Sequence, residues 1–319
     1  MSPLVAIIGA RYADFSIEQD GLAALGAELC SGDGASAEEI VRIAGDADVI
    51  LAGGAPRFDA SVIERLRARG IVRYGVGVDT IDLDAARLHG LWVAHVTDYG
   101  TEAVALHAVT LALAGIRRLH EADARVREGQ WSFGDLRPLH LPSALTAGVV
   151  GFGRIGQRAA QMLVGLGFRV LAHDLAVPVD GVAGVRAASL DEVLSLCDVI
   201  SLHAPGVSGT PLLDRDALAR LRPGSVLVNT ARASLIDVVA LADGLRAGRP
   251  RIAALDVFPQ EPPDLSKFDG VRERLLLTPH MAWYTEESER IQRQRAVEAV
   301  RRLLSGERPD DVVVEPDAR

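Results

Sequence analysis

The stretch Ala147-Gly-Val-Val-Gly-Phe-Gly-Arg-Ile-Gly156 decides the fold of this chain. An apolar strand predicted over Ala147–Val150 runs directly into a Gly-x-Gly-x-x-Gly pattern, and a helix is predicted after it over Ile155–Gly165. This arrangement is typical of dinucleotide binding, because the glycines permit a tight turn and let a pyrophosphate approach the helix N-terminus. The pattern alone is a weak signal, and its place between a strand and a helix makes it strong.

The identity of the dinucleotide is indicated by the end of the next strand. The predicted strand Arg169–His173 is followed by Asp174. A carboxylate there accepts hydrogen bonds from the ribose 2′-hydroxyl of NAD and repels the 2′-phosphate of NADP. Leu175 and Ala176 come next and supply no compensating arginine, so the sequence predicts NAD. The cofactor-binding residues predicted from this segment are Gly151, Gly153, Arg154, Ile155, Gly156 and Asp174.

Apolar strands and helical stretches alternate through most of the chain. Continuous apolar strands separated by helices indicate parallel sheets that are covered on both faces, and therefore an α/β fold. Besides the two strands above, the predicted strands are Leu4–Ile8, Val49–Ala52, Ile71–Tyr74, Trp92–Val96, Val199–His203, Ser225–Asn229, Ile252–Val257 and Leu275–Thr278. The other predicted helices are Leu190–Ser195, Asp214–Leu221 and Val238–Ala247.

This alternation falls into two blocks, residues 1–100 and about 145–285, of which only the second carries the glycine pattern. A length of 319 residues favours two domains, at roughly 150 residues each. Between the blocks, Thr101–Gln130 is predicted as one long helix. A charged amphipathic helix is predicted over Glu286–Leu304, and the tail from Arg308 is predicted to be loosely held.

Composition argues against several classes of protein. A formal net charge of −9 disfavours nucleic-acid binding, which needs a basic surface. Lys267 is the only lysine, so a Schiff-base or Walker-type mechanism has no good candidate. Cys30 and Cys197 lie in no metal-binding or disulfide pattern, and we expect no metal site. No signal-peptide pattern or long apolar run is visible, so we expect a cytoplasmic protein without membrane contact.

Three polar side chains, Arg232, Glu261 and His280, each follow a predicted strand of the second block. Ligands bind at this edge of an open parallel sheet. A guanidinium holds a carboxylate in fork geometry, and a histidine delivers a proton near neutral pH. A neighbouring carboxylate orients that ring and stabilises its protonated form. Singly, each residue has an ordinary structural explanation, but together they predict hydride transfer between NAD(H) and a small 2-oxo or 2-hydroxy acid.

In order and spacing, the motifs resemble those of the D-isomer-specific 2-hydroxyacid dehydrogenase family over nearly the whole chain. The matching segments are Gly151–Gly156, Asp174, His203-Ala204-Pro205 with Thr210, Asn229–Arg232, Asp256–Glu261 and Thr278–His280. The resemblance implies a flavodoxin-like substrate domain from residues 1–100 and 286–319. It also implies an inserted Rossmann domain over residues 101–285, and a homodimer.

The resemblance also implies roles for single residues. By position, Arg232 binds the substrate, His280 is the acid/base and Glu261 is its partner. Further cofactor contacts are implied for His203, Ala204, Pro205, Thr210, Thr230, Ala231, Asp256 and Val104. The segment Gly75-Val76-Gly77 matches the loop whose backbone amides grip the substrate carboxylate.

Two further residues indicate a branch of the family. Arg73 and the run Met281-Ala-Trp283-Tyr are most similar to the branch that contains the C-terminal-binding proteins. There, the arginine contacts the substrate carboxylate and the tryptophan walls the substrate pocket. Arg73 and Trp283 are therefore substrate-pocket candidates.

The sequence departs from the family pattern at two positions. Ala233 follows Arg232 where the family usually has glycine, and Leu106 stands where a glutamate is common. If the glycine is needed for its backbone freedom, Ala233 shifts Arg232 slightly. Neither departure removes a chemical group from the predicted reaction.

Several alternatives stay open. Phosphite oxidation would keep Arg232, Glu261 and His280, and a phosphonate analogue of a hydroxy acid is equally compatible. Formate dehydrogenases typically have glutamine where Glu261 stands, which argues against them. An NADH-sensing dimeric scaffold of corepressor type is the alternative from a different class, although a scaffold has no physical need for the intact catalytic set. The substrate itself is not specified, because one methylene changes discrimination by only about 1–3 kcal/mol.

Overall fold

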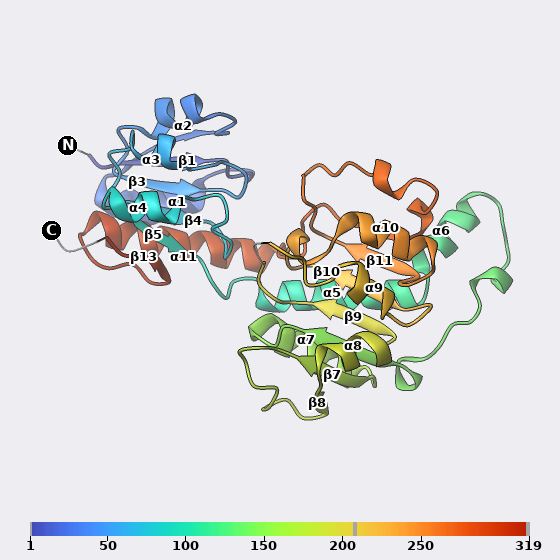
Figure 1. Ribbon diagram of the computed structural model, residues 1–319. Helices are drawn as coiled ribbons and strands as arrows, with labels where there is room; N and C mark the ends of the chain where they lie inside the picture. The colour runs from blue at the N-terminus through green and yellow to red at the C-terminus, as the bar shows by residue number, and fades with distance from the viewer. Residues whose placement is uncertain (1, 207–208, 317–319) are drawn as a thin grey trace. The chain divides into compact units, whose positions relative to one another are not determined.

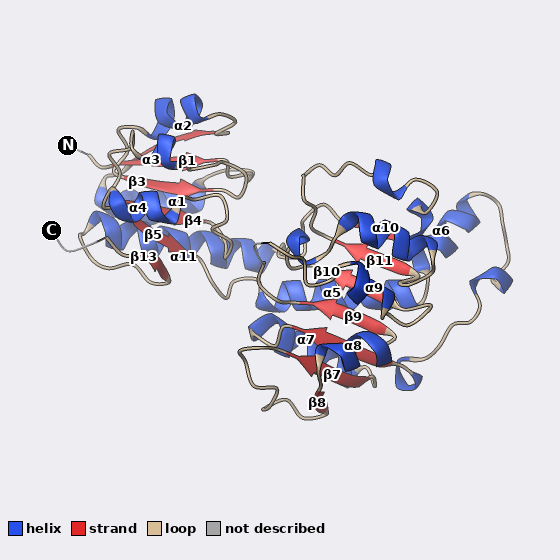
Figure 2. Ribbon diagram, in the orientation of Figure 1, coloured by secondary structure: helices blue, strands red, loops and turns tan. Residues whose placement is uncertain are grey.

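The structure is a computed structural model and describes residues 2–206 and 209–316. The chain divides into two compact units (Figure 1). Met1–Gly100 and Thr285–Arg319 form one, here called the terminal unit, and Thr101–Tyr284 form the other, the central unit. The division lies one residue before the boundary expected from the sequence. Each unit is an α/β structure in which helices flank a sheet (Figure 2).

The terminal unit is built on a six-stranded sheet with the order β13-β5-β4-β3-β1-β2. Its strands are β1 (Leu4–Ile8), β2 (Glu28–Gly32), β3 (Val49–Ala52), β4 (Gly70–Arg73), β5 (Trp92–His95) and β13 (Val312–Val314). The first five are parallel in the order 2-1-3-4-5, which is the flavodoxin-like arrangement. The flavodoxin-like prediction is thus confirmed. The strand β2 was not expected, because this partly exposed edge strand lacks a continuous apolar run.

The expectation of a loosely held tail is wrong. Strand β13 pairs antiparallel with β5, joining Val312 to Ala94 and Val314 to Val93. Val314 is 1% exposed and packs in the core of the terminal unit. The three consecutive valines of β13 are suited to this edge, and their pairing satisfies backbone groups of β5 that would otherwise form an open edge.

The helices of the terminal unit cover its two sheet faces. They are α1 (Ser16–Leu22), α2 (Ala37–Ala44), α3 (Ala60–Ile63), α4 (Leu83–Leu88) and α11 (Glu286–Leu304). Helix α11 has the predicted bounds, because Thr285 and Ser288 form a capping box at its start. Its buried residues Ala296, Val300 and Leu303 join the core cluster that includes β1, β3 and β4.

The central unit contains a seven-stranded parallel sheet with the order β12-β11-β10-β9-β6-β7-β8. Counted from β6, the order 3-2-1-4-5-6 is that of a Rossmann fold, with β12 added at one edge. The strands are β6 (Thr146–Val150), β7 (Arg169–His173), β8 (Val185–Ala187), β9 (Val199–Leu202), β10 (Val226–Asn229), β11 (Ile252–Leu255) and β12 (Leu275–Leu277). The Rossmann prediction is confirmed, although the short exposed edge strand β8 was not expected.

The long helix predicted over Thr101–Gln130 is wrong. Two helices occupy this stretch, and they meet at Arg118, whose φ of +52° is incompatible with a continuous α-helix. The Arg118 guanidinium is buried, binds the carboxylate of Glu121 and donates to the carbonyl of Asp135 at 2.9 Å. The contact with Asp135, outside both helices, overrides the local helical preference. The helices of the central unit are α5 (Thr101–Ile116), α6 (Leu119–Arg127), α7 (Arg154–Gly165), α8 (Leu190–Leu196), α9 (Arg215–Ala219) and α10 (Val238–Arg246).

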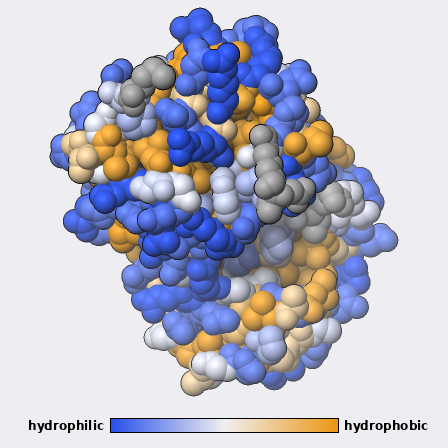
Figure 3. All heavy atoms as spheres, turned by 90° about the vertical axis from the view of Figure 1, so that its left-hand side faces the viewer, coloured by the Kyte–Doolittle hydropathy of each residue, from blue (hydrophilic) through white to orange (hydrophobic). Residues whose placement is uncertain are grey.

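The described residues contain neither a membrane-spanning helix nor a group of side chains that could hold a metal ion. On the face in Figure 3, hydrophobic residues form small groups among hydrophilic ones. Across residues 2–206 and 209–316, no helix has both the length and the apolar character needed to cross a bilayer. In the same ranges, no three His, Cys, Asp or Glu side chains are grouped to hold a metal ion.

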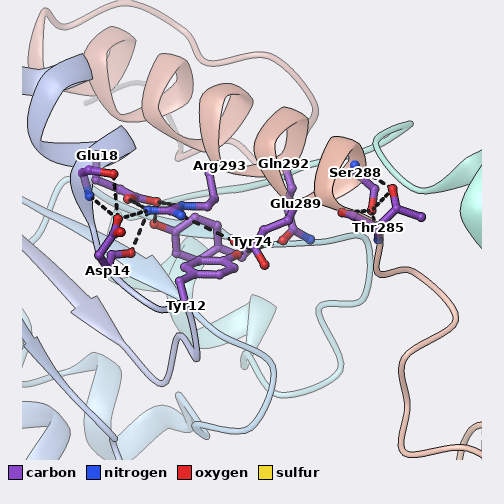
Figure 4. Close-up of polar contacts among 10 residues, drawn as sticks. Tyr12, Asp14, Glu18, Tyr74, Thr285, Ser288, Glu289, Gln292 and Arg293 are labelled. Atoms are coloured by element: carbon purple, nitrogen blue, oxygen red, sulfur yellow. Dashed lines mark hydrogen bonds and ion pairs between the residues drawn. The ribbon is translucent and has the colours of Figure 1, made fainter.

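A buried ion pair ties α11 to α1 in the terminal unit (Figure 4). Glu18 is 0% exposed, and its carboxylate accepts from Nε and Nη2 of Arg293 at 3.0 and 2.7 Å. The hydroxyl of Tyr74 donates to the same carboxylate at 2.9 Å. Burial and the charge of Glu18 raise the pKa of Tyr74, so this hydroxyl stays protonated. Arg293 also lies over the ring of Tyr12, at 4.6 Å from its centroid.

We expect Glu18→Gln to lower the free energy of unfolding by about 3–5 kcal/mol, because it removes the buried carboxylate that binds two nitrogens of Arg293. The Asp14 and Glu289 carboxylates that remain lie further away, at 3.7 and 3.5 Å. The matched control is Glu38→Gln, which breaks the exposed Arg65–Glu38 pair at 2.8 Å. The control should change stability by less than about 1 kcal/mol. Urea unfolding followed by circular dichroism measures both. Equal effects of the two substitutions would contradict a stabilising role for the buried pair.

Candidate active site

The proposed catalytic residues lie at one edge of the central sheet. Arg232 follows β10, Glu261 follows β11 and His280 follows β12, and these three strands are neighbours in the sheet. Because the strands are parallel, their carboxyl ends share one edge. The sheet topology thus gathers at one edge residues that are 48 positions apart in the sequence, from 232 to 280.

His280 and Glu261 are bonded to each other. Nδ1 of His280 lies 3.0 and 2.9 Å from the two carboxylate oxygens of Glu261. The backbone N–H of Phe258 donates to Glu261 at 3.2 Å, which holds the carboxylate in its loop. Both side chains are well exposed, at 51% for His280 and 41% for Glu261. Since Nδ1 faces the carboxylate, Nε2 is the ring nitrogen placed to exchange a proton with a bound molecule.

The turn that carries Arg232 is held by hydrogen bonds of its backbone, and Nη1 of Arg232 donates to the Ala231 carbonyl at 2.8 Å. The Asn229 side chain donates to the Arg232 carbonyl at 2.9 Å and accepts from the Ala231 N–H at 3.0 Å. Asn229 itself is buried at the end of β10, so it braces the turn that presents the guanidinium. Ala233 begins a 3-10 helix that ends at Leu235 and has no positive φ. The glycine that the family usually has here is therefore not required for this backbone conformation.

The glycine turn fits the pyrophosphate of a dinucleotide. Gly151 has a φ of +92°, and a Cβ there would overlap the backbone of His203 and Ala204. A Cβ on Gly156 would overlap the carbonyl of Gly151, so helix α7 packs tightly against the turn. By contrast, the space beside Gly153, the N-cap of α7, is open. An open position at the N-terminus of a twelve-residue helix suits an anion. Arg154 and Ile155 form the first turn of that helix.

Asp174 lies where the ribose of the cofactor is expected. Its carboxylate accepts from the backbone N–H groups of Phe152 at 2.5 Å, Ala176 at 2.7 Å and Val177 at 2.8 Å. Partial burial acts to raise the pKa of Asp174, but these three donors outweigh burial and lower it. The side chain therefore stays anionic at neutral pH, as repulsion of a 2′-phosphate requires.

Other predicted cofactor contacts surround this edge of the sheet. His203 directly follows β9, and its Nε2 lies 2.9 Å from the Ser201 hydroxyl. Nδ1 of His203 and the Thr230 hydroxyl are buried and have no partner within the described protein. Two such atoms on neighbouring strands fit a bound group that supplies the missing hydrogen bonds. Ala204 and Ala231 are partly buried, Pro205 and Thr210 are exposed, and Val104 is partly buried on α5.

The lowered pKa of His203 predicts how the stability of the protein depends on pH. Desolvation lowers the pKa of His203 from its ordinary value of 6.5 to about 4. The neutral ring therefore contributes stability that is fully present above pH 6.5 and is lost as the pH falls towards 4. Between about pH 7.5 and about pH 5 the loss should reach at most about 2 kcal/mol.

We expect His203→Gln to reduce this pH dependence of the urea-unfolding midpoint in the cofactor-free protein. The exposed His89, at the end of α4, provides the matched control. His89→Gln should leave the dependence as it is in the wild type. An unchanged pH dependence in His203→Gln would mean that His203 does not titrate with a lowered pKa.

The predicted substrate loop belongs to the terminal unit. Gly75 has a φ of +109°, and a Cβ there would lie 3.0 Å from the hydroxyl of Tyr99 and 3.5 Å from the amide nitrogen of Gln292. Nδ1 of His95 lies 2.7 Å from the carbonyl of Val76, which fixes the loop. Val76 is 46% exposed, so backbone at the tip of this loop is accessible.

The remaining substrate-pocket candidates lie in different units. Arg73 ends β4, beside the glycine loop and within the terminal unit. Trp283 belongs to the central unit and contacts Tyr284 edge to face, with ring centroids 5.7 Å apart. Both side chains are partly buried. Their assignment to a substrate pocket stays a prediction.

Sequence reasoning missed one functional group of the central unit. Thr278 was noted only as part of a motif, and Asp256 only as a cofactor contact. In the structure, the Thr278 hydroxyl donates a hydrogen bond to the Asp256 carboxylate at 2.5 Å, two residues before His280 in the sequence. The available signal was an aspartate at the end of a wholly apolar strand, because a carboxylate in that position needs donors.

Comparison with known proteins agrees with the fold. Residues 109–282 match the model of the D-isomer specific 2-hydroxyacid dehydrogenase NAD binding domain. D-3-phosphoglycerate dehydrogenase of Mycobacterium leprae is 36% identical over 304 residues, which cover 93% of this chain and 57% of that protein. Hydroxypyruvate reductase of Thermotoga maritima is 32% identical over 275 residues, covering 84% of this chain and 87% of that protein.

A solved structure shares the fold over almost the whole chain. D-lactate dehydrogenase from Aquifex aeolicus, complexed with NAD and lactic acid, superposes with a TM-score of 0.86. It is 27% identical, and the match covers 98% of this chain and 100% of that one. This chain spans about half the length of the phosphoglycerate dehydrogenases it matches, between 54% and 57% for the four mycobacterial ones.

The Rossmann sheet, the glycine turn and the acid at the end of β7 define an NAD-binding protein of the Rossmann class. More narrowly, the match over more than half of the chain and the close relatives show that this chain belongs to the D-isomer specific 2-hydroxyacid dehydrogenase family. The matched segment is the NAD-binding domain of that family.

Proposed function

We propose that this protein transfers a hydride between NAD(H) and a small 2-oxo or 2-hydroxy acid of the D configuration. The observation that carries the proposal is the pair formed by His280 Nδ1 and the Glu261 carboxylate at 2.9–3.0 Å, in the unit that also holds the glycine turn. A histidine oriented by a carboxylate is suited to exchange a proton with an oxygen that gains or loses charge.

Each residue has a defined part in this reaction. When bound, the nicotinamide supplies or accepts the hydride. In reduction, Arg232 holds the substrate carboxylate and polarises the carbonyl, and protonated His280 donates from Nε2 to the carbonyl oxygen. Glu261 stabilises the protonated ring and fixes its orientation. In oxidation, neutral His280 accepts the hydroxyl proton at the same nitrogen.

The names of the relatives support a 2-hydroxy acid as the substrate class. They include D-3-phosphoglycerate, hydroxypyruvate and D-lactate enzymes, all of which act on a carbon next to a carboxylate. Arg73, the Gly75–Gly77 loop and Trp283 are our candidates for the residues that contact the rest of the substrate. The similarity of Arg73 and Trp283 to the branch of C-terminal-binding proteins stays a prediction.

We expect His280→Ala to lower kcat by about 10²- to 10⁴-fold, because the proton is then exchanged with water instead of a positioned group. Loss of NADH absorbance against a panel of 2-oxo acids, with phosphonate analogues included, measures it. Phosphite oxidation is followed in the same assay as the gain of NADH absorbance from NAD. NADPH should support much less turnover than NADH, since Asp174 repels its 2′-phosphate.

The matched control is His120→Ala, which removes a half-buried histidine of the same unit whose Nε2 lies 3.1 Å from the Glu273 carbonyl. It should leave kcat unchanged. Full activity in His280→Ala would contradict the assignment of the acid/base. Tight NADH binding by a folded protein that turns over no member of the panel would contradict the enzyme proposal and favour an NADH-sensing scaffold.

We also propose that the protein is a homodimer that associates through the segment formed by α6 and residues 128–144, here called the arm. The arm extends away from the sheet of the central unit (Figure 1). It carries large apolar side chains that are strongly exposed, whereas such groups are rarely gathered on the surface of a monomer. These are Leu119, Val126, Trp131, Phe133 and Leu141, with 53–90% of their surface exposed.

We expect the double substitution Trp131→Asp and Phe133→Ser to convert the dimer to a monomer, because it places a charge in the apolar surface that would be buried. Light scattering coupled to size exclusion measures the mass of the particle. Leu88→Asp is the control, since Leu88 is 83% exposed but lies on α4 of the terminal unit. A wild-type mass of one chain would contradict the proposal.

A further inference from the structure

The carboxylate of Asp256 is enclosed just beyond the end of β11, where the residue is 0% exposed. Its Oδ1 accepts from the Thr278 hydroxyl at 2.5 Å and from the Met281 N–H at 2.9 Å. Its Oδ2 accepts from the Ala282 N–H at 2.9 Å. A buried anion depends on such donors, so the carboxylate and the donors fix one another.

These donors lie before and after His280 in the sequence, and the backbone of His280 has a conformation that needs support. Its φ of +53° lies in the left-handed region, where a residue with a side chain is disfavoured. Residues persist in this region when the surrounding structure holds them. The Asp256 carboxylate does so by binding Thr278 before the histidine and Met281 and Ala282 after it.

His107 of helix α5 contacts the hydrogen-bonded pair of Thr278 and Asp256. Its Nε2 lies 3.1 Å from the Thr278 hydroxyl oxygen and 3.8 Å from Oδ1 of Asp256. The side chain is 19% exposed. Helix α5 is fixed against the sheet by its buried residues Ala105 and Ala108, which join the core of the central unit. His107 therefore projects from a rigid support.

The direction of these hydrogen bonds follows from the number of hydrogens. Thr278 has a single hydroxyl hydrogen, which it donates to the Asp256 carboxylate. The hydroxyl therefore donates to Asp256 and accepts from His107, so Nε2 of His107 carries a proton. The result is a directed chain from His107 through Thr278 to Asp256. Each bond in such a chain polarises the next.

We propose that His107 is a positioning residue for the acid/base His280, acting through Thr278 and Asp256. The inference rests on the proposed function, because it concerns how His280 is presented to the substrate. His107 touches neither His280 nor Glu261 through any hydrogen bond among the described residues. Its effect is to fix the hydroxyl of Thr278, and with it the carboxylate that clamps the His280 loop.

The first test compares substitutions that break the hydrogen-bond chain from His107 to Asp256 with substitutions that keep it. His107→Ala and Thr278→Val should each lower kcat about tenfold, the rate equivalent of one lost hydrogen bond. The KM for the 2-oxo acid and the Kd of NADH should change by less than about twofold, because the binding groups stay in place. His107→Gln and Thr278→Ser keep a donor and a hydroxyl, and should restore most of the rate.

A double substitution separates positioning from general destabilisation. His107→Ala combined with Thr278→Val should lose no more activity than either alone, since both break the same chain. Thr110→Ala is the control on the same helix, where the hydroxyl bonds only the Leu106 carbonyl at 2.8 Å. It should leave kcat unchanged. Additive losses, or no recovery in His107→Gln with the fold intact, would overturn the proposal.

A second readout needs no turnover and so separates this inference from the proposed function. The chain contains eight histidines, which carbon-13 labelling at Cε1 makes visible by NMR. The signal of His280 is assigned by its loss in His280→Gln. It should shift in His107→Ala and stay in place in His107→Gln and in His120→Ala. An unmoved His280 signal in His107→Ala would sink the proposal, whether or not any 2-oxo acid is reduced.

Discussion

The enclosed carboxylate of Asp256 is the constraint on which the catalytic edge of the central unit depends. An anion that is 0% exposed is tolerated only when donors converge on it, and here the donors come from the loop that carries His280. The loop therefore has one arrangement in which the carboxylate is satisfied. In that arrangement His280 adopts a left-handed backbone and meets Glu261. The hydrogen bonds that stabilise the buried carboxylate are thus the same ones that set the geometry of the proposed acid/base.

The parallel sheet supplies the frame for that requirement. Strands β10 and β11 are buried, and β12 consists of three leucines, so polar residues appear only where the strands end. Their shared direction places those ends on one edge, beside the open helix N-terminus at Gly153. An anionic phosphate, a guanidinium and an imidazole can be arranged there without burying unpaired charge in the sheet itself. In the terminal unit, by contrast, a buried charge is neutralised by its partner, because Glu18 pairs with Arg293 inside the core.

Much of this could be predicted from the sequence, because the strands that decide the fold are continuous apolar runs and the fingerprint has strict spacing. The inner strands of both sheets and the full length of α11 follow from such local signals, whereas the edge strands β2, β8 and β13 do not. The errors arose where long-range contacts override local preference. Arg118 lies at a break between two helices and donates to the Asp135 carbonyl, and β13 becomes ordered by pairing with β5. The role of His107 is of the same kind, since its link to Thr278 spans 171 positions.

The distribution of these residues between the units bears on specificity. Arg232, Glu261 and His280 all belong to the central unit. In the proposed reaction, they act on the carboxylate and the oxygen that every 2-hydroxy acid shares. Relatives named for phosphoglycerate, hydroxypyruvate and lactate differ only in the rest of the substrate. Discrimination among such acids therefore requires residues outside this set. The glycine loop after β4, with Arg73 before it, lies in a unit with its own sheet and core, so it can vary without disturbing the clamp around Asp256.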